Sequence, residues 1–171
     1  MDFNDVLINR RSVRKYKTDP VPREHLMELV KAGGLAATAG NFQPWEFVVI
    51  DDRKQISALK DACMGQEVFD TAPAVICVCA DPEKSATYGD RGMNYYCKLD
   101  CANATQNILL TAYNMGYGSL WVGGFKEDSI RQVLGIPAKI HVVSLIPIGK
   151  PDYEWNPPKR EVQDMIHWDK W

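Results

Sequence analysis

The chain has 171 residues, of which 46% are hydrophobic and 25% are charged, and its net charge is −2. That length suits a single domain with a core of its own, and the composition excludes a disordered chain. The slightly acidic balance argues against a general nucleic-acid-binding protein, and no apolar run has the length of a membrane span. Because the N-terminus does not resemble a signal peptide, we expect a cytoplasmic protein.

The first third of the chain is expected to form two helices, a strand and a third helix. Residues 3–9 have the pattern of a short amphipathic helical turn, and a second helix starts near Pro22 and weakens at two consecutive glycines. The stretch 45–52 is rich in β-branched and aromatic residues and predicts a strand that ends in an acidic turn. Residues 53–64 follow as a helix.

The rest of the chain alternates strands and helices. Residues 74–80 are apolar on both faces, as in a buried central strand, and a polar loop over 81–92 separates them from a long helix over 93–115. The later elements are a short strand 117–125, a helix 126–135 and a last strand 139–149. This order predicts an α+β fold with helices around one sheet, and it leaves the strand directions open.

The five cysteines allow two interpretations. Cys77 and Cys79 lie on the central strand, and Cys97 and Cys101 lie one turn apart on the long helix, so four thiols could bind a metal ion. Cysteine also packs as a small buried hydrophobic residue, and the C-x-C spacing is not usual for zinc. We therefore expect free, packed thiols, Cys63 included, and no metal.

Four cations crowd around one serine near the N-terminus. Arg10, Arg11, Arg14 and Lys15 surround Ser12 in a chain that is acidic overall. Guanidinium groups match the oxygens of a phosphate, and a hydroxyl adds a donor, so the cluster indicates a site for a phosphate monoester. A solvated helix end is the alternative, because short charge runs are common there.

Two further stretches have the composition of a ligand site. Residues 36–50 join a loop of small residues to Asn41, Gln43 and a strand, so backbone and amide groups can approach a flat ligand. Gly123 and Gly124 close the short strand and leave backbone N–H groups that can donate to a ring nitrogen or an oxyanion. A plain connection and a plain turn would use the same residues. No G-x-G-x-x-G follows a strand, which argues against a Rossmann domain.

In their order along the chain, these stretches resemble the nitroreductase family of FMN-dependent oxidoreductases. The similarity lies in RRSVRKY, NFQPWEFVV, APAVICVCA, GYGSLWVGGF, PIGKP and KREVQDMIHWDKW, which spread over nearly the whole chain. It implies one FMN-binding domain, residues 1–171, with a mixed central sheet flanked by helices. It also implies a homodimer with flavin at the interface, in which an extended C-terminal arm of about residues 150–171 reaches across the partner.

The resemblance assigns contacts to the cofactor residue by residue. Arg10 and Ser12 match positions that hold the phosphate and ribityl chain, with Arg11 assisting, and Arg160 matches a basic residue that closes on the phosphate. Arg14 matches the basic residue beside the pyrimidine edge of the flavin ring.

Other matches surround the flavin ring. Gly123 and Gly124 match glycines whose backbone lies near flavin N5, and Gln66 matches a residue that faces the pyrimidine edge. Asn41 and Gln43 match the loop at the dimer-shared site, where Thr38 replaces a serine of the family. No side chain is expected to act as an acid or a base.

The activity implied by the resemblance is a two-step, ping-pong transfer. NADH or NADPH would deliver hydride to flavin N5 and leave, and a flat conjugated acceptor such as a nitroaromatic or a quinone would take its place. Phe42, Tyr88 and Tyr95 could stack on this small-molecule acceptor, with packing of the tyrosines in the core as the alternative. Reductive dehalogenation, reduction of an activated double bond, flavin fragmentation and FMN binding without catalysis stay open on the same scaffold.

Overall fold

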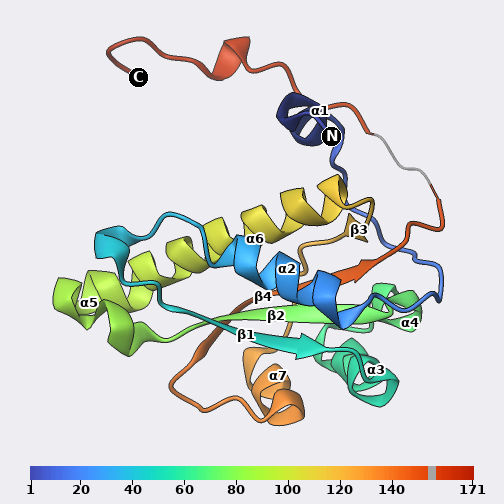
Figure 1. Cartoon of the computed structure of the whole chain (residues 1–171). Coiled ribbons are helices and arrows are strands. Elements are labelled where there is room, and N and C mark those ends of the chain that lie inside the picture. The colour runs from blue at the N-terminus through green and yellow to red at the C-terminus, as the bar shows by residue number, and fades with distance from the viewer. Residues whose placement is uncertain (154–156) are drawn as a thin grey trace.

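The computed structural model describes residues 1–153 and 157–171. Its elements follow the expected order of two helices and then strands alternating with helices (Figure 1). They are α1 (Phe3–Asn9), α2 (Arg23–Gly33), η1 (Ala39–Asn41), β1 (Trp45–Ile50), α3 (Arg53–Ala62), α4 (Val68–Thr71), β2 (Ala74–Ala80), η2 (Pro82–Tyr88), α5 (Gly89–Arg91), η3 (Gly92–Tyr96), α6 (Cys97–Asn114), β3 (Gly118–Ser119), α7 (Glu127–Leu134), β4 (His141–Gly149) and η4 (Gln163–Met165).

One four-stranded sheet lies at the centre of the fold, in the order β1-β2-β4-β3, and its ladders are all antiparallel. β2 is the buried central strand predicted by its apolar sequence, since none of its residues is more than 1% exposed. The parallel component of the expected mixed sheet is, among the described residues, the isolated bridge between Ser12 and Ser119. The α+β fold is confirmed, with an antiparallel sheet at its core.

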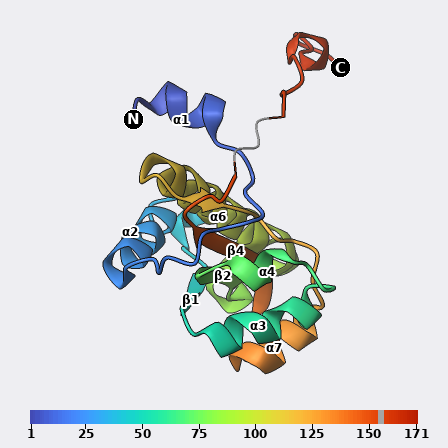
Figure 2. The same ribbon diagram turned by 90° about the vertical axis from the view of Figure 1, so that its right-hand side faces the viewer.

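Helices cover both faces of this sheet (Figures 1 and 2). Side chains alternate along β2, so Ile76 and Val78 pack with α2 and α6, while Cys77 and Cys79 pack with α3 and α7. Leu29, on the apolar face of α2, is fully buried in the first of these clusters. The longest helix, α6, runs along one face and has candidate site residues near both of its ends.

The prediction of a polar loop over residues 81–92 was wrong, because this segment is helical. Asp81 caps the 3₁₀ helix η2 by accepting a hydrogen bond from the Glu83 N–H at 3.1 Å, and Pro82 fits its first turn. The helix α5 and the π-helix η3 then lead directly into α6. A β-carbon at Gly92 would lie 2.1 Å from the Ser85 carbonyl oxygen, so only glycine allows these turns to pack this closely.

The strand expected over 117–125 is shorter than predicted. β3 contains two residues, and the chain contacts β4 again at the bridge between Val122 and Leu145. The helix α4, which lies between α3 and β2, was not predicted. Four residues are too few to produce a helical period in the sequence.

α1 and the C-terminal tail project from the layered body (Figures 1 and 2). The tail is joined to the N-terminal segment by a hydrogen bond from Arg11 Nε to the Pro157 carbonyl at 3.1 Å. Both projections carry exposed apolar side chains, and Trp168 and Trp171 are 85% and 101% exposed. Residues 154–156 of the predicted arm lie outside the described residues. None of the described helices has the length and apolar character that a membrane crossing requires.

Candidate functional site

The N-terminal cationic segment is fixed against the end of the sheet. Arg10 caps α1, and beyond it Ser12 bridges to Ser119 of β3, whose carbonyl accepts from the Val13 N–H at 3.0 Å. Tyr16 is 2% exposed, and its hydroxyl lies 2.7 Å from the Val13 carbonyl oxygen, to which it donates. Burial raises the pKa of Tyr16, so the phenol keeps its proton. The segment is therefore extended and pinned beyond the helix end.

The first two arginines of this segment have different environments. Arg10 is half-buried, and burial together with the charge of Arg11 lowers the pKa of its guanidinium. Among the described residues no carboxylate pairs with Arg10, so a bound anion would offset the cost of burying its charge. The Arg11 guanidinium donates to the carbonyls of Ile8 and Pro157 at 2.5 and 3.1 Å. Arg10 is available for a ligand, whereas Arg11 ties the helix end to the tail.

Three residues separate Ser119 from Gly123 and Gly124, the two glycines predicted at the site. Gly123 and Gly124 are exposed, so their backbone is open to a ligand. Gln66 belongs to the same group, because its Nε2 donates to the Gly124 carbonyl at 2.9 Å. The Ser119 hydroxyl is buried and has no hydrogen-bond partner among the described residues, which adds an unsatisfied polar group beside Ser12. The strand that pairs with Ser12 therefore continues towards Gly123 and Gly124.

Arg14 and Arg160 add exposed charge to this part of the molecule. Arg14 follows the pinned Val13, and Arg160 lies in the tail. In the part of the chain that the structure describes, neither forms an ion pair with a carboxylate. Both guanidinium groups therefore keep unneutralised charge.

Residues 38–43 form a tight loop with left-handed backbone at three positions. The φ angles of Gly40, Asn41 and Gln43 are 56°, 57° and 49°. The loop is closed by its own side chains, since the Gln43 N–H donates to Thr38 Oγ1 at 3.4 Å and Gln43 Nε2 donates to Asn41 Oδ1 at 3.1 Å. The structure therefore joins Thr38, Asn41 and Gln43 in one hydrogen-bonded loop.

A buried carboxylate at the start of α6 holds this loop in place. Asp100 is 5% exposed, and its Oδ1 accepts from the Ala39 N–H at 3.1 Å, while Oδ2 has no partner among the described residues. Burial raises the pKa of Asp100. This residue was not predicted from the sequence. Its position three residues after the buried Cys97, on the apolar side of the helix, was the available signal.

The candidate acceptor-binding residues contact one another beside the loop. The ring centroids of Phe42 and Tyr88 lie 5.3 Å apart in an edge-to-face arrangement, and those of Tyr88 and Tyr96 lie 5.8 Å apart. Tyr88 and Tyr95 are 46% and 51% exposed, which contradicts the alternative that they pack in the core. Tyr96 belongs to the same group of contacting rings.

The loop over 38–43 and the cationic segment lie near opposite ends of α6 (Figure 1). The loop over 38–43 is held by Asp100 in the first turn of this helix. At the last turn Tyr113 lines a cavity together with Arg11 and Val13 of the cationic segment. Asp100 and Tyr113 are about 20 Å apart along the axis of an α-helix. One chain therefore does not bring the two groups together.

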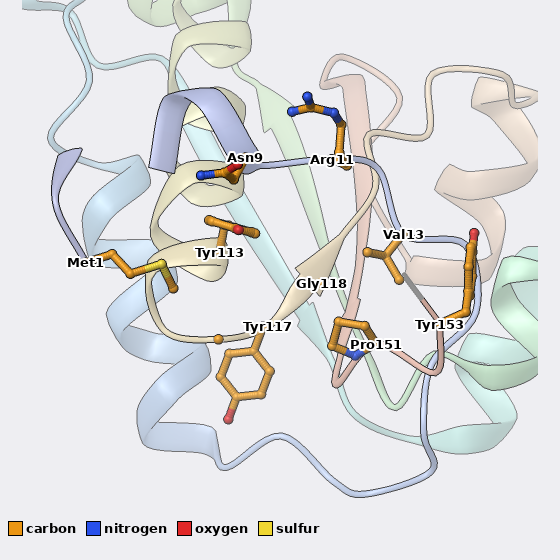
Figure 3. A pocket seen from close by; sticks show the side chains of 10 residues that line it. Met1, Asn9, Arg11, Val13, Tyr113, Tyr117, Gly118, Pro151 and Tyr153 are labelled. Carbon is orange, nitrogen blue, oxygen red and sulfur yellow. The ribbon is translucent and has the colours of Figure 1, made fainter. Parts of the chain in front are cut away.

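That cavity has a volume of about 410 Å³ and lies between α1, the cationic segment and the end of α6 (Figure 3). Apart from Arg11, the predicted cofactor contacts do not line it. A second cavity of about 370 Å³ lies between α1, α2 and α6, with Phe3 and Leu110 among its lining residues. Both cavities lie against the projecting helix α1, and only the first of them is lined by residues of the cationic segment.

The cysteines are all free and buried, as expected. Cys77 and Cys79 belong to the apolar cluster on one face of the sheet, and Cys97 and Cys101 belong to the cluster on the other face. Among the described residues, no three His, Cys, Asp or Glu side chains are placed to hold a metal ion. The four thiols therefore do not form the metal site that their spacing left open.

Comparisons with known proteins agree with this fold and with the motifs. The model of the nitroreductase family matches residues 7–67 and 62–150. An Archaeoglobus fulgidus protein named "Putative NADH dehydrogenase/NAD(P)H nitroreductase" is 36% identical over 97% of both chains, and a Thermus thermophilus NADH dehydrogenase is 30% identical over 98% of this chain and 96% of its own. The solved structure of an FMN-dependent nitroreductase from Clostridium difficile R20291 has a TM-score of 0.85 at 28% identity, covering 98% of this chain and 99% of its own. The chain belongs to the nitroreductase family.

Proposed function

We propose that this protein is an FMN-dependent oxidoreductase that uses NADH or NADPH to reduce a flat conjugated acceptor such as a nitroaromatic or a quinone. The observation that carries the proposal is Arg10, a half-buried guanidinium without a described carboxylate partner, next to a serine bridged to the strand that leads to Gly123 and Gly124. The names of relatives support it, because they include NAD(P)H nitroreductase and FMN-dependent nitroreductase.

The residues fit the chemistry of FMN at its charged end. Arg10 and Ser12 supply an unpaired cation and a hydroxyl for the phosphate, and Arg160 adds a second cation from the tail. Arg11 holds the backbone that presents Arg10, through its bonds to the carbonyls of Ile8 and Pro157. The phosphate would replace solvent around charges that the fold has already partly buried.

The ring end uses backbone and a further cation. Bound FMN would supply the hydride-transfer chemistry between the nucleotide and the acceptor in separate half-reactions, while residues of this chain would hold and orient its ring. Arg14 would stabilise negative charge near the pyrimidine edge, and the exposed backbone of Gly123 and Gly124 would orient a ligand atom by N–H donation. Gln66 fixes this backbone through its bond to Gly124.

We infer that the complete site forms between two copies of the chain. The loop over 38–43 and the cationic segment lie near opposite ends of α6, so a second copy is needed to bring a loop to a cationic segment. The exposed apolar residues of α1 and of the tail support such a dimer, because Phe3, Ile8 and Trp168 are 66%, 64% and 85% exposed. In this arrangement the arm of about residues 150–171 would lie on the partner.

Anaerobic stopped-flow spectroscopy of the FMN-loaded protein tests the proposed function. Mixing with NADH or NADPH should bleach the flavin absorbance, and a second mixing with a nitroaromatic or a quinone should restore it. A protein that binds FMN but is not bleached by either nucleotide would contradict the oxidoreductase activity. A protein that does not bind FMN would contradict the cofactor.

A further inference from the structure

Arg91 is an exposed cation held between two tyrosine rings. Its Cζ lies 5.1 Å from the ring centroid of Tyr95 and 5.2 Å from that of Tyr96. Its Nε donates to the Tyr96 hydroxyl at 2.7 Å, which fixes the plane of the guanidinium. Among residues 1–153 and 157–171, neither Nη group has a hydrogen-bond acceptor and no carboxylate pairs with Arg91. Two sets of N–H donors therefore remain for a ligand.

The backbone beneath this cation has an uncommon conformation. Tyr95 and Tyr96 lie in the π-helix η3, a structure that is rare in proteins and is frequent at functional sites. Gly92 begins that turn and packs against the Ser85 carbonyl at a distance no β-carbon could occupy. The segment is therefore built to hold the tyrosines and Arg91 in one arrangement.

Tyr88, Tyr95 and Tyr96 form a tyrosine cluster, and this cluster touches the loop that is proposed to reach the flavin. Tyr88 contacts both Phe42 and Tyr96, with ring centroids 5.3 and 5.8 Å apart. A β-carbon at Gly40 would lie 3.0 Å from the Tyr88 hydroxyl, so this hydroxyl lies against the loop backbone. A ligand beside the loop would therefore meet exposed aromatic surface with Arg91 at its far side.

Acidic groups of the preceding segment do not neutralise Arg91. Glu83 accepts from Lys139 at 2.5 Å, and Lys84 of the same segment donates to Glu46 at 2.5 Å. Asp90 is its neighbour in sequence, is exposed, and forms no ion pair with it among the described residues. The local charge available to a ligand is positive.

We propose that Arg91 determines specificity by binding an anionic group, a carboxylate or a phosphate, on a planar ligand that lies against the tyrosine cluster. The inference rests on the proposed function, because it places that ligand in the position from which it exchanges hydride with the flavin. The anion belongs either to the acceptor, as an aromatic acid, or to the nicotinamide nucleotide. Oriented guanidinium donors bind both kinds of anion strongly.

The experiment compares acceptors that differ only in charge. For the FMN-loaded wild type, R91Q, R91K and R23Q, kcat/KM is measured with 4-nitrobenzoate and with 4-nitrobenzamide, and KM is measured for NADH and NADPH. The affinity for benzoate and for benzamide is measured separately by isothermal titration calorimetry. Arg23 is a matched control, because it is exposed and pairs with Asp51 away from this cluster.

R91Q should lower the preference for the acid over the amide about tenfold, in kcat/KM and in affinity, as expected for a lost charge-assisted hydrogen bond. R91K should retain part of that preference, and R23Q should match the wild type. A rise in the KM for NADH or NADPH with an unchanged acceptor preference would assign the anion to the nucleotide. If R91Q changes neither the preference for the acid over the amide nor the KM for NADH or NADPH, while nucleotides still bleach the flavin, this inference is wrong and the proposed function stands. If the flavin is not bound or not bleached, both are overturned.

Discussion

The cationic segment and the loop over 38–43 are held in place by different means. The cationic segment is pinned by backbone pairing, through the bridge of Ser12 to Ser119 and the buried Tyr16. The loop is held by side chains, through its closing bonds between Gln43 and Asn41 and the bond from Ala39 to Asp100. The cationic segment pairs with the sheet, whereas the loop is attached through side chains to the start of α6.

This difference matches the parts of the cofactor that the two regions are proposed to meet. A phosphate has the same shape in every turnover, so a rigid set of donors suits it. The ring must be approached in turn by a nucleotide and by an acceptor, and a loop with exposed aromatic neighbours allows that exchange. We therefore expect substitutions in the cationic segment to act on FMN affinity, and substitutions of the aromatic residues beside the loop to act on acceptor selection.

The largest effect is expected from R10Q. Charge-assisted hydrogen bonds contribute about 1.5–3 kcal/mol, so the Kd for FMN should rise on the order of 10- to 100-fold. Quenching of flavin fluorescence during titration measures the Kd. R23Q removes an exposed guanidinium in α2 and should bind FMN like the wild type. If R10Q binds FMN with the affinity of the wild type, the cationic segment is not part of the FMN site.

A pair of glycine substitutions compares the rigidity of the two regions. In G118A the new β-carbon would lie 2.7 Å from Val13 Cγ2, and Val13 cannot retreat because its N–H is bonded to Ser119. In G40A the contacts are the side-chain tips of Phe42 and Tyr88, which can move, although the φ of 56° adds strain.

We expect G118A to destabilise the fold by about 2 kcal/mol through overpacking, and G40A by about 1 kcal/mol. Urea unfolding measures both free energies. A larger loss of unfolding free energy in G40A than in G118A would mean that the loop over 38–43 is the rigid region and the cationic segment the adaptable one.

The sequence predicted the central elements well, because their burial patterns are strong. The apolar stretch over 74–80 and the periodic apolar positions of α2 needed no tertiary information. The segment 81–92 was mistaken for a loop because its helices are short and exposed, and because its packing depends on the contact between Gly92 and Ser85. Such a contact is not visible in a local pattern.

Within the candidate site, the sequence predicted residues better than their arrangement. Ser12 and Ser119 lie side by side because β3 pairs with the cationic stretch, and no local signal predicts that pairing. Asp100 and Arg91 were missed because their roles follow from what they face. Asp100 faces the loop backbone, and Arg91 faces two rings.

The smallest effect is expected from D100N, which keeps an acceptor for the Ala39 N–H and removes the buried charge. Burial raises the pKa of Asp100, so in the wild type the unfolded chain ionises first as pH rises and stability falls until the folded carboxyl also ionises. At pH 7, D100N should be more stable by about 1 kcal/mol, within the usual range for one substitution.

The gain of D100N should shrink as the pH falls through the folded-state pKa towards the ordinary value of an aspartate. Thermal unfolding between pH 3 and pH 7 measures this dependence. The exposed D90N serves as the control and should show no such trend. A constant difference across this range would show that the Asp100 carboxylate is not penalised by burial.

Complementation between two defective variants is the most direct test of a site shared by two chains. R10Q disables the cationic segment, and N41G/Q43G removes both amides of the loop while allowing its left-handed backbone. Each variant alone should bind FMN poorly. Co-expressed with different tags, they should regain about one quarter of the wild-type binding sites, because half of the dimers are mixed and each mixed dimer has one intact site. Mixed dimers that form but bind no more FMN than the separate variants would contradict a site built from both chains.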